Sequence, residues 1–103
     1  MDKTNITLII QLLERVRQKP GMYLGNDVHA ILHFMTGVNC TCSVFGLQRD
    51  EAIYKAAVIE RGWEYSAKAT LYQMMKKGMD YFHIVNEFFT IEINAWKNML
   101  ELP

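Results

Sequence analysis

The last quarter of the chain most constrains its fold, because it carries apolar residues on two faces at the spacing of a helix. The first face consists of Tyr81, Ile84, Val85, Phe88, Ile91, Ala95 and Met99, and the second of Phe89, Ile93, Trp96 and Leu100. Asp80 precedes both faces and can cap the helix. A surface helix has one apolar face, so a helix with two indicates the central member of a bundle.

Four further helices are predicted before this one from stripes of apolar residues at helical spacing. The first follows a cap at Thr4 or Asn5, and its stripe is Ile6, Ile9, Ile10, Leu13 and Val16. The second follows Asn26 or Asp27, and its stripe is Val28, Ile31, Leu32, Met35 and Val38. The third runs from Asp50 to Arg61 and stops at Gly62. The fourth begins at Ser66, and one face carries Leu71, Met74, Met75 and Gly78.

The run CTCSVFG, residues 40–46, is short and apolar, so it could form a strand or continue the second helix. No partner strand is visible elsewhere in the sequence, which favours the helix. The sequence therefore predicts one all-α domain over residues 1–103, a compact bundle of about five helices.

The connector PGMYLG, which joins the first two predicted helices, is unusually apolar for a loop. Pro20 cannot continue a helix, and Gly21 can close it in the left-handed conformation. We expect the following Met-Tyr-Leu to be buried as a plug over the open end of the core, with the Tyr23 hydroxyl bonded to a partner. The structural motif comprises Arg17, Pro20, Gly21, Met22, Tyr23 and Gly25.

The charge balance and the apolar runs argue against several classes of function. Lys plus Arg equals Asp plus Glu, 11 each, whereas dedicated nucleic-acid binders usually carry a basic excess. No apolar run approaches the length that crosses a bilayer, and the N-terminus lacks the small-residue cleavage site of a secretory signal. Cys40 and Cys42 are too close for an unstrained disulfide. We therefore expect a cytoplasmic protein that binds neither nucleic acid nor a membrane.

One group of residues could support metal or thiol chemistry. His29 and His33 are four residues apart, and Cys40 follows two turns later, so the three could bind zinc or act as a nucleophile with its base. The pattern lacks a fourth ligand and a glycine run for an oxyanion hole. We expect no metal, no cofactor and no catalytic residue, and keep a small metal- or thiol-dependent enzyme as the alternative.

The segment ERVRQKPGMYLG resembles the N-terminal signature of the DNA gyrase B subunit and its relatives, approximately VRKRPGMYIG. In that ATPase family, the following helix carries a Glu that activates water and an Asn that holds magnesium. Here Asn39 falls near the family Asn, but Met35 stands at the Glu position and Val38 at a neighbouring Asp position. A thioether cannot accept a proton from water, so the likeness indicates a shared helix-loop-helix and not an ATPase.

A second resemblance covers more of the chain. Small bacterial proteins of about this length contain R-x-R-P-x-M-Y-L-G, a Gly-Trp connector, a short helix and a long C-terminal helix with paired Phe. The matching parts here are Arg17 to Gly25, Gly62-Trp63, Leu71 to Met79 and Phe88-Phe89, with Lys19 where Arg is commoner. Some of these proteins resemble immunity proteins encoded beside polymorphic or contact-dependent growth inhibition toxins. The resemblance implies a non-enzymatic module that binds a cognate toxin domain.

A toxin that cuts nucleic acid has a basic cleft, so a neutralising partner would present carboxylates and occlude the active site or the substrate cleft. The candidate contact residues are Asp50, Glu51, Glu60, Glu64, Glu87 and Glu92. The first four are favoured, because they flank Trp63 and Tyr65, and exposed aromatic residues beside acids make good anchors for a basic partner. Trp63 could equally belong to the core. A non-catalytic adaptor subunit without a toxin partner is a further alternative.

Overall fold

The computed structural model describes residues 3–102, except for the side chains of residues 67 and 68. The described chain is all-helical, as the sequence predicts. Its helices are α1 (Lys3–Gln18), α2 (Pro20–Leu24), α3 (Ala30–Val44), α4 (Glu51–Glu60), α5 (Ala67–Lys76) and α6 (Tyr81–Leu100). Residues 40–44 continue α3, which confirms the helical interpretation of CTCSVFG over those positions.

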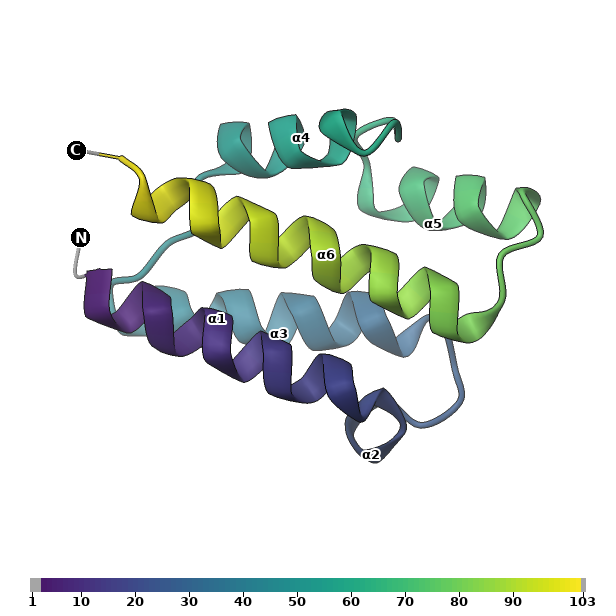
Figure 1. Ribbon diagram of the computed structural model, residues 1–103, viewed down its shortest axis with the longest axis horizontal. Helices are drawn as coiled ribbons and strands as arrows, with labels where there is room; N and C mark the ends of the chain where they lie inside the picture. Colours follow the sequence, from purple (N-terminus) through teal and green to yellow (C-terminus); the bar gives the residue numbers. More distant parts are fainter. Residues whose placement is uncertain (1–2, 103) are drawn as a thin grey trace.

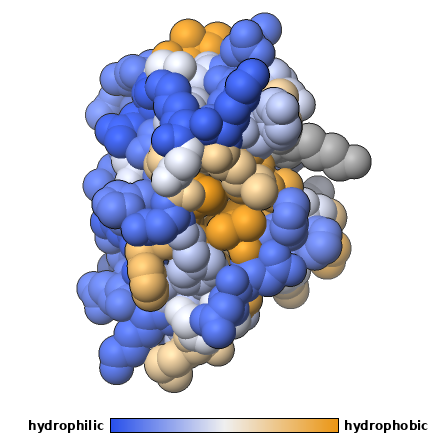
Figure 2. All heavy atoms as spheres, turned by 90° about the vertical axis from the view of Figure 1, so that its right-hand side faces the viewer, coloured by the Kyte–Doolittle hydropathy of each residue, from blue (hydrophilic) through white to orange (hydrophobic). Residues whose placement is uncertain are grey.

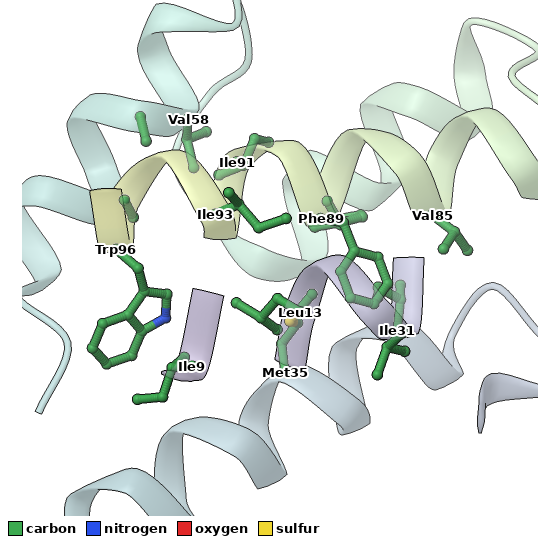
Figure 3. Packing of buried hydrophobic residues seen from close by; sticks show 14 of the residues in the cluster. Ile9, Leu13, Ile31, Met35, Val58, Val85, Phe89, Ile91, Ile93 and Trp96 are labelled. Atoms are coloured by element: carbon green, nitrogen blue, oxygen red, sulfur yellow. The ribbon is translucent and has the colours of Figure 1, made fainter. Parts of the chain in front are cut away.

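Helix α6 is the central helix, as its two apolar faces predict. It packs most extensively against α1 and α4, and Figure 1 shows it between the α4–α5 pair and the α1–α3 pair. Residues of both predicted stripes are buried, including Phe88 of the first and Trp96 of the second. In Figure 3, Phe89 of α6 points toward Ile31 of α3, while Leu13 of α1 and Met35 of α3 lie at the centre of the cluster and Ile9 of α1 lies below Trp96 of α6. Full burial of one such side chain contributes roughly 1.5–3 kcal/mol.

The predicted helix signals at Ser66, Asp80 and Gly62 are confirmed. The Ser66 hydroxyl oxygen accepts a hydrogen bond from the Ala69 amide at 3.4 Å, and Asp80 Oδ1 accepts one from the His83 amide at 2.9 Å. Such bonds satisfy amide groups that have no partner within the first turn. Gly62 follows α4 with a φ of +90°, a conformation that glycine adopts without steric cost.

The prediction of a buried PGMYLG plug is wrong for two of its three large residues. Met22 is 73% exposed and Tyr23 is 50% exposed, whereas Leu24 is only 8% exposed. Residues 20–24 form α2, a short helix with proline in its first turn, where the missing amide proton costs nothing. Because this is a single helical turn at one end of the molecule (Figure 1), only one side of it can face the core.

The end of α2 is held by Gly25 and by a residue distant in sequence. Gly25 takes the left-handed conformation with a φ of +66°, whereas Gly21 has no positive φ, contrary to prediction. The hydroxyl of Tyr81, in the first turn of α6, donates a 2.6 Å hydrogen bond to the Gly25 carbonyl. The tyrosine that ties this segment to the rest of the fold is therefore Tyr81, while Arg17 pairs with Glu14 within α1.

Candidate functional site

A cleft of about 500 Å³ opens between α3, α4 and α6. Its apolar wall includes Leu32, Met35 and Phe88, and two tyrosines, Tyr54 and Tyr65, line another part. Its polar residues include Asn39, Cys40, Arg49, Glu51 and Glu92. The cleft thus combines an apolar wall with charged groups, a composition that suits an amphipathic ligand or side chain.

Arg49 organises the polar part of the cleft. Its Nη1 lies 2.5 and 2.6 Å from the two carboxylate oxygens of Glu92, and its Nη2 lies 2.9 Å from Oε1 of Glu51. The guanidinium also stacks 3.7 Å from the centre of the Tyr54 ring. The Arg49 guanidinium therefore joins α6 to the start of α4. Its hydrogen bonds to the two glutamates are charge-assisted and hence stronger than hydrogen bonds between neutral groups.

Tyr65 and Glu51 border the cleft where it meets solvent. The Tyr65 hydroxyl donates a hydrogen bond to Glu51 Oε2, and its ring meets the Tyr54 ring edge-on at 6.0 Å between centres. This hydrogen bond lowers the pKa of Glu51, with Arg49 contributing. Burial raises the pKa of Tyr54 to about 12. At neutral pH Glu51 is therefore ionised and Tyr54 is neutral.

Glu92, which we predicted at a partner-binding surface, is instead a core residue. It is 1% exposed, on α6, with Arg49 as its ion-pair partner. Burial raises the pKa of Glu92, and the charge of Arg49 and its hydrogen bonds oppose that rise. A carboxylate with so little exposed surface is not part of the outer surface of the protein, so Glu92 is removed from the candidate surface contacts.

Glu87 is likewise buried, at 8% exposure, and not a free surface carboxylate. Arg61 binds it through Nε at 3.0 Å and Nη2 at 2.6 Å, and the indole nitrogen of Trp63 donates to it at 2.8 Å. Burial alone would raise the pKa of Glu87, but these hydrogen bonds outweigh it and lower the pKa. Trp63 is half-buried, and its polar edge is committed to this pair.

The other four predicted contact residues, Asp50, Glu51, Glu60 and Glu64, are exposed. Three lie at the ends of α4 or immediately before it, and Glu64 lies in the connector to α5. Asp50 also caps α4, because its Oδ1 accepts a 3.1 Å hydrogen bond from the Ile53 amide. The four favoured carboxylates are thus exposed, whereas the two on α6 are buried.

Two polar atoms near the cleft are buried without a hydrogen-bond partner within the described part of the chain. They are Oδ1 of Asn39 and Nε of Arg49. The Asn39 side-chain nitrogen Nδ2 donates to the Met35 carbonyl at 2.9 Å, whereas the side-chain oxygen Oδ1 accepts no hydrogen bond from the described residues. Buried groups of this kind are costly unless water or a ligand satisfies them.

The alternative site built on His29, His33 and Cys40 is not assembled. The two histidines line a separate cavity of about 510 Å³ with Leu71, Tyr72 and Met75, whereas Cys40 lines the cleft between α3, α4 and α6. Across residues 3–102 as described, no group of three His, Cys, Asp or Glu could hold a metal ion.

Figure 2, which views the end of the molecule near the N-terminus of α6, shows hydrophobic surface at the centre and hydrophilic residues around it.

Sequence reasoning missed Arg49, Tyr54 and Asn39 as residues of one cleft. Arg49 directly precedes the α4 cap and belongs to no stripe, so no local pattern distinguishes it from a solvated arginine.

None of the helices in the described part of the chain has the length and apolar character needed to cross a membrane. Comparison with protein-family models, with curated proteins and with solved structures finds no match for this chain.

Proposed function

We propose that this chain is an immunity protein that binds and neutralises a bacterial toxin, with a nuclease as the expected partner. The proposed contact surface consists of Asp50, Glu51, Glu60, Glu64 and Tyr65, and is called here the α4 surface. It contains the four predicted carboxylates that are exposed, beside an aromatic side chain that is 41% exposed. The motif resemblance of the sequence is the second support.

The observation that carries this proposal is the pairing of exposed Tyr65 with Glu51 at the edge of a cleft. Aromatic residues dominate binding energy at protein interfaces when they fill well-packed positions, and carboxylates accelerate association with a basic partner. An inhibitor acting this way covers the toxin's substrate cleft and performs no chemistry. Inhibition by binding inside the producing cell also requires a cytoplasmic protein, which forms part of the proposal.

The test is co-expression with a candidate toxin domain, sought among the genes beside this one. The wild-type chain should restore growth and form a stable complex with the purified toxin domain. Tyr65→Ala should weaken that complex by roughly 30-fold, the effect of losing an interface anchor worth about 2 kcal/mol. Tyr23→Ala is the matched control, because Tyr23 is also an exposed tyrosine but lies in α2, across α6 from α4 (Figure 1). An adjacent toxin that neither binds this chain nor loses toxicity in its presence would refute the function.

A further inference from the structure

The cleft between α3, α4 and α6 is lined by more carboxylates than cations and contains hydrogen-bond acceptors that are not fully used. Two carboxylates, Glu51 and Glu92, share the single guanidinium of Arg49, so carboxylates outnumber cations among the residues that line the cleft. Glu51 keeps unused lone pairs, because its side chain is 62% exposed and accepts only from Arg49 and Tyr65 among the hydrogen bonds of the described chain. Oδ1 of the Asn39 side chain adds an acceptor that has no partner among the described residues.

The tyrosine rings of the cleft already attract cations of the chain itself. Arg49 stacks on the Tyr54 ring at 3.7 Å, and the Lys55 ammonium lies 5.9 Å from the centre of the Tyr65 ring. A ring face binds a cation through its quadrupole, and a planar guanidinium also stacks on it. The two rings meet edge-on, with 70° between their planes, so their faces point in different directions.

These features together specify the chemistry of an occupant. It needs several hydrogen-bond donors, a positive charge, a flat head that stacks on tyrosine and an apolar stem that runs along Leu32, Met35 and Phe88. We propose that the cleft receives an arginine side chain of the partner protein. This inference rests on the proposed function, because it names the group of the toxin that the α4 surface captures.

The first experiment needs no toxin. N-acetyl-arginine methylamide is titrated into the isotopically labelled wild-type chain, and amide shifts are followed by NMR. Binding should shift residues around the cleft with a dissociation constant on the order of 1 mM, the range for a ligand of that size. The citrulline analogue has the same shape without the charge and should bind at least about tenfold more weakly, because charge-assisted hydrogen bonds and cation–π contacts are lost.

Two protein variants locate the site. Glu51→Gln should weaken binding of the arginine probe by roughly threefold to tenfold, because it removes an exposed carboxylate at the cleft. Glu101→Gln removes an exposed carboxylate just after α6 that neither lines the cleft nor belongs to the α4 surface, and should leave the affinity unchanged. Equal affinity for arginine and citrulline, shifts away from the cleft, or equal effects of the two variants would each overturn the inference.

The second experiment separates this inference from the function on which it rests. Each arginine of the toxin domain is replaced by glutamine, and the affinity is measured for the wild-type chain and for Glu51→Gln. One toxin arginine should show a coupling of about fivefold or more with Glu51 in the double-mutant cycle. A tight complex without any such coupling would overturn the inference and leave the immunity function standing. Selective binding of the arginine probe by a chain that neutralises no toxin would support the cleft's chemistry and refute the function.

Discussion

The indole nitrogen of Trp63 donates a 2.8 Å hydrogen bond to Oε2 of Glu87, which fastens the connector before α5 to the central helix. Arg61 supplies two more hydrogen bonds to the same carboxylate. The connector that carries Glu64 and Tyr65 is therefore fixed by a buried carboxylate behind it. The α4 surface depends on this attachment for its shape.

Replacement of Glu87 by glutamine should make stability less dependent on acid pH. The folded-state pKa of Glu87 is lowered, so its stabilisation is present above the ordinary glutamate pKa of about 4.3 and is lost as the pH falls through the folded value. We expect Glu87→Gln to cost about 1–3 kcal/mol at pH 7, and the difference from wild type to narrow below about pH 4. Urea unfolding at several pH values measures this.

The exposed Glu60→Gln variant is the control for the Glu87 experiment, and its stability should stay within about 0.5 kcal/mol of the wild type. A Glu87→Gln penalty that is independent of pH between 3 and 7 would contradict the assigned ion pair with Arg61.

Leu24 and Tyr23 should differ sharply in their contributions to stability, although they are adjacent. Leu24 is buried, so Leu24→Ala should cost about 2–5 kcal/mol through lost burial and the cavity left behind. Tyr23 is exposed and belongs to the same short helix, so Tyr23→Ala should cost less than about 1 kcal/mol. Thermal unfolding of the two variants side by side measures both. Equal losses would mean that Tyr23 packs as the sequence suggested.

The helical architecture was predictable because its signals are local. The stripes of α6 repeat every three or four residues, and Asp80 marks the start within the same segment. Both apolar faces are present in the sequence, so the central position of the helix follows without knowledge of its partners. PGMYL was misread because proline serves both to end one helix and to begin the next. Apolar character alone could not show which of its residues faces the core.

The candidate site was only partly predictable, because its key pairs are distant in sequence. Glu92 pairs with Arg49, 43 residues earlier, and Glu87 with Arg61, 26 residues earlier. Periodicity within α6 places the two glutamates on the helix but carries no information about a cation on another element. Because a helix with two apolar faces has little surface exposed to solvent, a glutamate between those faces could have been predicted to be buried.

Loss of Arg49 should destabilise the fold in a way that reverses on acidification. Arg49→Met leaves Glu92 buried without a counter-charge, a change that typically costs about 3–5 kcal/mol. Burial already raises the pKa of Glu92, and removal of the opposing guanidinium raises it further. A raised folded-state pKa gives stability that is present below the ordinary glutamate value and lost as the pH rises. The variant should therefore regain stability relative to wild type as the pH falls toward 4.

The double variant Arg49→Met/Glu92→Leu tests this explanation. It removes both charges, so it should be markedly more stable at pH 7 than Arg49→Met alone, and its difference from wild type should vary less with pH. If the double variant is as unstable as the single one, the loss comes from Arg49 packing on Tyr54 or binding Glu51, and not from an isolated buried charge.

Charge reversal at the exposed end of α4 should slow association with a nuclease toxin more than it accelerates dissociation. Glu60→Lys/Glu64→Lys changes two exposed carboxylates and spares the Asp50 cap. Exposed charges at the edge of an interface act mainly by steering, so the association rate should fall roughly tenfold at low salt. At 1 M salt the Debye length is about 3 Å, and most of the difference in association rate from wild type should vanish.

Glu14→Lys on α1, across α6 from α4 (Figure 1), is the control and should leave the rate close to wild type. Should the double variant associate as fast as wild type and still protect growth, inhibition would have to depend on apolar contacts or on another face of the molecule.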